Sequence, residues 1–183
     1  GCLLAFGAGF VALRRLRRGY GDDRDGILYP DDDRDGDSTA RPDSICLFGD
    51  FAVRDRHNRD ITYLFSVRLR QTFCLILQHS AEEGISSQRL SSLLWPDKPE
   101  DKVKNSRGVT INHLRKILGE MDGIELIHSK GCFKLVQSEP FYCDYTRCCE
   151  IVSSGEAGGS RDELIRILGR GKFLKGSDQP LFD

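Results

Sequence analysis

The segment from Asp101 to Leu118 constrains the fold more than any other part of the sequence. When residues are placed about 100° apart, as on an α-helix, its large apolar side chains gather on one side. These side chains are Val103, Ile111, Leu114, Ile117 and Leu118. Gly119 follows the last of them, and glycine often ends a helix. The pattern predicts an amphipathic helix with one face on a hydrophobic core.

The opposite side of this helix is polar and carries no carboxylate between Asp101 and Glu120. It consists of Asn105, Val109, Asn112, His113 and Lys116, with Thr110 and Arg115 on its flanks. In a DNA major groove, Asn can bond adenine bidentately, Lys can reach guanine or phosphate, and Val or Thr can touch a thymine methyl group. A solvated helix face usually mixes both signs of charge. The composition therefore favours DNA recognition, with a plain solvated face as the alternative.

Two β-rich runs stand near the start of this region, at Ile45–Arg54 and Asp60–Phe65. The polar segment Asp55–Arg59 separates them, so we expect an antiparallel hairpin.

Two further helices are expected between this hairpin and Asp101. The first carries the apolar stripe Leu69, Phe73, Ile76 and Leu77 and runs to about His79, before Gly84. The second has Ser86 or Ser87 as its cap, carries Leu90, Leu93 and Leu94 on one face, and stops at Trp95–Pro96.

Two short β runs follow the long helix, at Ile124–Ile127 and Cys132–Val136. The residues between them, His128–Gly131, contain a glycine suited to a tight turn, which predicts a second hairpin with Ser129 and Lys130 at its tip. Strands, three helices and a terminal hairpin predict an α+β fold, a winged helix-turn-helix over residues 44–137. In that fold the third helix enters the major groove and the hairpin, or wing, lies along the DNA backbone.

The run Leu93–Gly119 together with Ile124–Val136 resembles the winged-helix domain of OmpR/PhoB-type regulators, and more closely that of SARP-like transcriptional activators. The matching pieces are a Leu-Trp pair ending the second helix, Asn105, the Ile-x-x-Leu-Arg-Lys-x-Leu-Gly pattern of Ile111–Gly119, and the Gly-aromatic-x-Leu-like strand of Gly131–Leu135. The likeness covers roughly half of the chain.

The resemblance implies double-stranded DNA and RNA polymerase as partners, and it implies which residues face DNA. Carried over position by position, these are Asn105, Ser106, Val109, Thr110, Asn112, His113 and Lys116, with Ser129 and Lys130 in the wing. Several of these positions are often Arg in the family and are Asn or His here. Because fewer cations release fewer counterions, we expect modest affinity from one copy and self-association on repeated sites.

The C-terminal part, residues 138–183, is expected to be helical at Phe141–Val152 and Arg161–Gly176. It is similar to the start of the bacterial transcriptional activator domain, a tetratricopeptide-like (TPR-like) helical array. Such repeats need about three units to be stable, so we interpret it as a truncated first repeat. The alternative is a helical appendage of the winged helix.

Residues 1–20 begin with the uncharged apolar run Gly1–Leu13, followed by Arg14, Arg15, Arg17 and Arg18. A bilayer crossing needs about 20 apolar residues, and a chain that starts with Gly is interpreted as a fragment, so we read this run as the end of a transmembrane helix. Clustered Arg marks the cytoplasmic side. The sequence thus predicts a bacterial inner-membrane protein with its DNA-binding part in the cytoplasm. A signal peptide is disfavoured because the basic residues follow the apolar run, and a surface helix because no polar face interrupts it.

Residues 21–43 are rich in Asp and are expected to be a solvated acidic linker. The spacing of Asp31, Asp33, Asp35 and Gly36 resembles half of a calcium-binding loop, but Pro42 replaces the Glu that would close it.

The charge distribution and the absence of catalytic and metal-binding motifs limit the classes of function that the sequence supports. Residues 44–137 carry fourteen Lys and Arg against eleven Asp and Glu, an excess of three positive charges in a chain whose net charge is −1. The seven cysteines form no C-x-x-C pair, no His follows His128, and no phosphate loop or hydrolase motif occurs. We therefore expect no enzyme activity, cofactor or metal. A winged-helix protein-interaction module without specific DNA binding remains the competing hypothesis.

Overall fold

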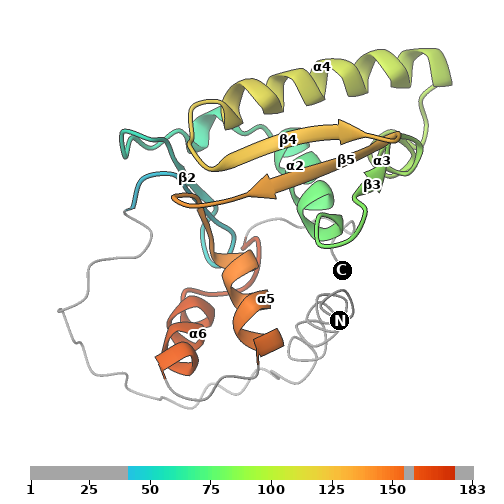
Figure 1. The fold of residues 1–183 in the computed structure, drawn as a ribbon. Helices are drawn as coiled ribbons and strands as arrows, with labels where there is room; N and C mark the ends of the chain where they lie inside the picture. The colour runs from blue at the N-terminus through green and yellow to red at the C-terminus, as the bar shows by residue number, and fades with distance from the viewer. Residues whose placement is uncertain (1–40, 155–158, 176–183) are drawn as a thin grey trace.

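The computed structural model describes residues 41–154 and 159–175, which form an α+β fold. Five α-helices and two small three-stranded sheets make up these residues (Figure 1). The mixed fold class predicted from the sequence is confirmed at this level.

The first sheet joins two strands at the start of the described chain to a short strand that follows the second hairpin. Strand β1 (Ser44–Cys46) pairs antiparallel with β2 (Ala52–Arg54), with Ile45 opposite Val53. On its other edge, β1 pairs in parallel with the short strand β6 (Tyr142–Cys143). Because β1 has a partner on both edges, it is the central strand and is completely buried.

The predicted hairpin partner at Asp60–Phe65 is wrong. This segment contains the 3₁₀ helix η1 (Thr62–Leu64), and only an isolated bridge between Arg54 and Asp60 resembles strand pairing. Two side chains explain the difference. The Asp60 carboxylate accepts a hydrogen bond from the Thr62 backbone N–H at 2.9 Å, and the Thr62 hydroxyl accepts one from the Val53 N–H at 2.9 Å. The Thr62 side chain thus accepts the hydrogen bond from a β2 backbone N–H that would otherwise be available to the backbone of a third strand.

Three helices follow, close to their predicted positions: α2 (Val67–His79), α3 (Ser87–Leu94) and α4 (Glu100–Leu118). The Ser66 hydroxyl caps α2, and of the two candidate caps for α3 the structure uses Ser86, whose hydroxyl accepts from the Arg89 N–H at 3.1 Å. Leu93 is half-buried, whereas the other apolar residues predicted to line α2 and α3 are buried.

The second sheet lies beneath α4 (Figure 1). Its strands are β3 (Ile85–Ser86), β4 (Ile124–Ser129) and β5 (Cys132–Gln137), in the order β3-β5-β4. The β4–β5 pair is the predicted antiparallel hairpin, with Leu126 opposite Leu135. Lys130 and Gly131 form its turn with φ values of 50° and 78°, as a two-residue turn of type I′ requires.

The C-terminal helices α5 (Asp144–Ser154) and α6 (Gly159–Gly169) pack together and return to the first sheet. The buried carboxylate of Asp144 accepts hydrogen bonds from the backbone N–H groups of Leu47 and Phe48 at 2.8 and 3.1 Å. The Leu174 N–H donates to the Leu47 carbonyl at 2.7 Å. The C-terminal part is therefore fastened directly to the turn that follows β1.

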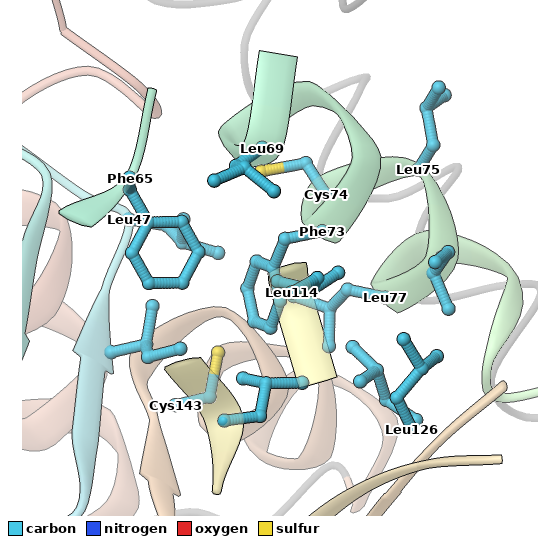
Figure 2. Close-up of a cluster of buried hydrophobic side chains, with 14 of the residues drawn as sticks. Leu47, Phe65, Leu69, Phe73, Cys74, Leu75, Leu77, Leu114, Leu126 and Cys143 are labelled. Carbon is cyan, nitrogen blue, oxygen red and sulfur yellow. The ribbon is translucent and has the colours of Figure 1, made fainter. Parts of the chain in front are cut away.

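One hydrophobic cluster extends through all of these elements. Figure 2 shows Phe73 of α2 beside Leu114 of α4, with Leu47 and Phe65 on one side and Leu126 of β4 on another. Cys143, from the C-terminal part, reaches the same cluster. The core thus crosses the boundary at residue 137 that the sequence suggested.

The linker prediction extends too far at its C-terminal end. Asp43 is buried rather than solvated, because its carboxylate accepts a hydrogen bond from the Asp122 N–H at 2.7 Å and its own N–H donates to the Asp55 carbonyl at 3.1 Å. The rest of the predicted linker, up to residue 40, and its half calcium loop lie outside the described residues.

The predicted inner-membrane location is corrected. Within residues 41–154 and 159–175, no helix combines the length and the apolarity that a bilayer crossing requires. Residues 1–20, on which the prediction depended, lie outside the described part of the chain.

Candidate nucleic-acid interface

Helix α4 separates its side chains into two faces as the sequence predicted. The buried residues of the helix are the five apolar residues named from the pattern: Val103, Ile111, Leu114, Ile117 and Leu118. Glu100 and Asp101 occupy its first turn and Arg115 and Lys116 its last, so the charges at both ends oppose the helix dipole. These charges and the burial of one face explain why the segment is helical despite Gly108 in its middle.

Five of the candidate residues lie on the exposed face of α4: Asn105, Val109, Asn112, His113 and Lys116. Val109 is 63% exposed, so its methyl groups are accessible to a ligand. The amides of Asn105 and Asn112 make no hydrogen bond with any residue that the structure describes, so their donors and acceptors point to solvent. The hydrogen-bonding groups of these two amides are therefore available to a ligand.

Ser106 and Thr110 differ from these five because both are half-buried and engaged. The Thr110 hydroxyl donates to the Ser106 carbonyl at 2.8 Å, one helical turn back. The Ser106 hydroxyl accepts a hydrogen bond from Nζ of Lys98 at 3.2 Å. Sequence reasoning missed Lys98, which lies in the α3–α4 loop and adds a cation at the edge of the exposed face.

The hairpin tip carries the last two candidates, Ser129 and Lys130, and both are exposed. The tip is held against the start of α3, since the N–H and the hydroxyl of Ser87 donate to the Gly131 carbonyl at 2.9 and 3.0 Å. His128 packs on the Phe133 ring at 4.5 Å between centroids, and its Nε2 lies 3.2 Å from the Ser87 hydroxyl. The position of the tip is therefore fixed by side chains.

Ser87 also connects the hairpin to α4. Its carbonyl accepts a hydrogen bond from Nη1 of Arg107 at 3.2 Å, and the same nitrogen donates to the Ser91 hydroxyl at 2.6 Å. Residues of α4 and of the hairpin turn thus bond to one residue of α3 (Figure 1 shows the three elements). The sequence pattern did not single out Arg107, although its spacing of four residues from both Val103 and Ile111 places it on the inner face.

The charge around α4 is uneven. Residues 102–119 carry no carboxylate, whereas Asp97, Glu100 and Asp101 cluster just before them. An anionic ligand is therefore favoured along the body of the helix and disfavoured at its very start.

Three cysteines of the C-terminal part lie together in sequence but are buried in the structure. Cys143, Cys148 and Cys149 are buried, and burial raises the pKa of the Cys143 thiol to about 12 and that of Cys149 to about 11. Such thiols are neutral and unreactive near pH 7. Among the described residues, no group of three His, Cys, Asp or Glu side chains is placed to hold a metal ion.

A shallow groove of about 540 Å³ lies between the end of α2, the end of β5 and helix α5. Leu77, Leu135 and Tyr145 contribute to its floor, and Arg147 lies at its side in an ion pair with Glu163 at 2.8 Å. The Arg147 cation is thus already paired with a carboxylate, and Arg41, which also lines the groove, lies over the Tyr142 ring.

No protein-family model matches this chain, and no curated protein or solved structure matches it either.

Proposed function

We propose that the chain is a sequence-specific double-stranded DNA-binding transcription regulator, with residues 44–137 as a winged-helix domain of the OmpR/PhoB type. In this proposal α4 is the recognition helix that enters the major groove, and the β4–β5 hairpin is the wing that follows the backbone. The order of elements is consistent with that fold. Helices α2, α3 and α4 precede the β4–β5 hairpin, and this hairpin pairs with the short strand β3 between α2 and α3.

The observation that carries the proposal is the exposed face of α4. It presents unpaired amides, an exposed Val109 and Lys116, without a carboxylate, over a helix whose other face is fully buried. Ser87 fixes this helix to the hairpin tip, so the two groups of proposed DNA contacts keep a constant spacing. A preset spacing reduces the conformational entropy lost on binding.

The test is a binding assay with the full chain. Sites are first selected from random duplex DNA at low salt, and the affinity for the selected duplex is then measured by fluorescence anisotropy at several salt concentrations. With Lys98, Lys116 and Lys130 on phosphates, log Kd should rise with log salt with a slope of about 3. Lys116→Ala should lower that slope by about 1, whereas Lys172→Ala, an exposed lysine far along the chain, should leave it unchanged.

Two results would contradict the recognition-helix assignment. One is unchanged affinity for a selected site in both Asn112→Ala and Lys116→Ala. The other is the absence of any enriched site at low salt, which would favour the competing hypothesis of a protein-interaction module. The small excess of three positive charges in residues 44–137 is the observation that supports that second function.

We further propose that α5 and α6 begin a TPR-like helical array that brings copies of the regulator together on repeated sites. Support comes from the packing of α5 on α6 and from Ile165 and Leu168, which lie one turn apart on the outer side of α6. Replacing both by Ser should remove cooperative binding to a duplex with two selected sites while single-site affinity stays the same. Unchanged cooperativity would favour a helical appendage.

A further inference from the structure

We infer that α4 reads adenine·thymine base pairs, so that the preferred DNA is an A·T-rich tract rather than one recognised through guanine. The inference rests on the proposed DNA-binding function and specifies the class of sequence that the same face accepts.

The arginines of α4 are the first part of the argument. Bidentate Arg contacts to guanine are the commonest specific contacts in protein–DNA complexes. Here the Arg107 guanidinium is directed at α3, where it donates to the Ser87 carbonyl and the Ser91 hydroxyl. The guanidinium of Arg115 is directed at β4, where Nε donates to the Leu126 carbonyl at 3.3 Å. Both arginines of the helix thus hydrogen-bond to their own domain, Arg107 through Nη1 and the exposed Arg115 through Nε alone, and the proposed function assigns Lys116 to a phosphate.

The second part of the argument is the set of side chains on the exposed face of α4. Asn105, Val109 and Asn112 follow one another at intervals of four and three residues, which places them on one line along the helix. All three are exposed. Gly108 lies beside this line, and a Cβ atom built there would have no neighbour within 4 Å. The missing side chain lets a base edge come close to the helix backbone.

The chemistry of these groups matches adenine and thymine. An Asn amide can donate to N7 of adenine and accept from its N6 amino group, which gives two hydrogen bonds to one base. The Val109 methyl groups complement the 5-methyl group of thymine, which is the one apolar group that base pairs show in the major groove. Asn105 and Asn112 are separated by about 10 Å along the helix, which corresponds to roughly three base-pair steps. We therefore expect a central tract of about four A·T pairs.

The experiment uses the intact chain and a duplex selected from random DNA. Each thymine of the selected tract is replaced in turn by deoxyuridine, which lacks only the 5-methyl group. One or two such replacements should weaken binding about fourfold, the effect of losing one buried methyl group. Replacing adenine by 7-deazaadenine, which lacks the N7 acceptor, should weaken binding about tenfold. A 2,6-diaminopurine replacement, which changes only the minor groove, should have no effect through α4.

Protein variants connect these effects to particular side chains. In Val109→Ala the sensitivity to deoxyuridine should disappear at one thymine, because the methyl group has already lost its partner. Val67→Ala is the matched control, since Val67 is similarly exposed, at 57%, but lies at the start of α2. Asn112→Ala should remove the sensitivity to 7-deazaadenine at one position and leave the deoxyuridine effect unchanged.

The outcomes separate the inference from the proposed function. Selected sites with G·C pairs at the protected positions, or affinity that is insensitive to deoxyuridine in every position, would overturn the A·T inference while DNA binding stands. If no duplex is retained from the random pool at low salt, the proposed function itself fails, and the inference fails with it.

Discussion

Gly108→Ala is expected to stabilise the protein and to weaken its binding to DNA. Gly108 lies in the interior of α4, where glycine destabilises a helix by about 0.8–1 kcal/mol relative to alanine. An added Cβ would meet no atom of the protein within 4 Å, so no steric cost offsets this gain. The free energy of unfolding should rise by about 0.5–1 kcal/mol, and Tm by roughly 2–4 °C.

The same methyl group should interfere with a close ligand. If the major groove approaches α4 at Gly108, the extra carbon must be accommodated in a packed interface, which typically costs about 1–3 kcal/mol. We therefore expect Kd for the selected duplex to increase about tenfold or more. A change that stabilises the free protein and weakens its complex cannot be explained by partial unfolding.

Stability is measured by urea and thermal denaturation, and affinity by fluorescence anisotropy on the same preparations. Gly169→Ala is the matched control, because Gly169 is also helical, at the end of α6, and also has open space at its Cβ position. This control should leave affinity unchanged. Unchanged affinity in Gly108→Ala would refute close approach at this point of α4, and reduced stability would refute the argument from open space.

Three further predictions concern contacts inside the protein. Arg107→Met removes both hydrogen bonds to α3, so the free energy of unfolding should fall by about 1 kcal/mol. The Kd for DNA should rise about fivefold. An affinity equal to that of the unchanged protein would show that the link to Ser87 does not position the hairpin. Asp144→Asn places an amide donor against a backbone N–H, so the free energy of unfolding, measured by urea denaturation, should fall by about 2–3 kcal/mol. A fall near zero would contradict the role of this carboxylate. The hydrogen bond from Arg147 lowers the pKa of Glu163, so the stability that this pair contributes is present above Glu163's ordinary pKa of 4.5 and is lost as the pH falls below it. Glu163→Gln should therefore destabilise the protein by about 0.5 kcal/mol at pH 7 and by progressively less as the pH is lowered below 4.5, and a loss that does not change with pH would exclude this linkage.

Local patterns predicted helices α2, α3 and α4 well, whereas the helix predicted from Phe141 begins only at Asp144 and the one predicted at Arg161–Gly176 ends at Gly169. The inner face of α4 could be identified residue by residue, because a helix with one buried side repeats its apolar residues at a fixed angle. The cap of α3 and the turn of the β4–β5 hairpin could also be predicted from the sequence, since both depend on residues close in sequence, Ser86 for the cap and Lys130–Gly131 for the turn.

The sheet at the N-terminus was not predictable in this way. The strand expected at Asp60–Phe65 has high β propensity, but the hydroxyl of Thr62 bonds to β2 and turns the chain into a 3₁₀ helix. The third strand of that sheet, β6, has only two residues and comes from the far end of the domain, so no local signal marks it. For the candidate site, the exposed face could be listed from the sequence, whereas the link from Arg107 through Ser87 to the hairpin required the tertiary structure.

The closure of the first sheet has a consequence for how the chain folds during synthesis. Leu47 and the carboxylate of Asp144 that binds it are 97 residues apart. At a translation rate of about 5–20 residues per second, the region of β1 waits roughly 5–20 s for this partner after it has itself been made. During that interval the edge of β1 that later pairs with β6 is open to other strands. Helices α2, α3 and α4 are synthesised well before Asp144, so we expect β1 to keep an unpaired edge while these helices are already available to pack. An unpaired strand edge is a site at which neighbouring chains can pair, and we expect misassembly to occur at this stage.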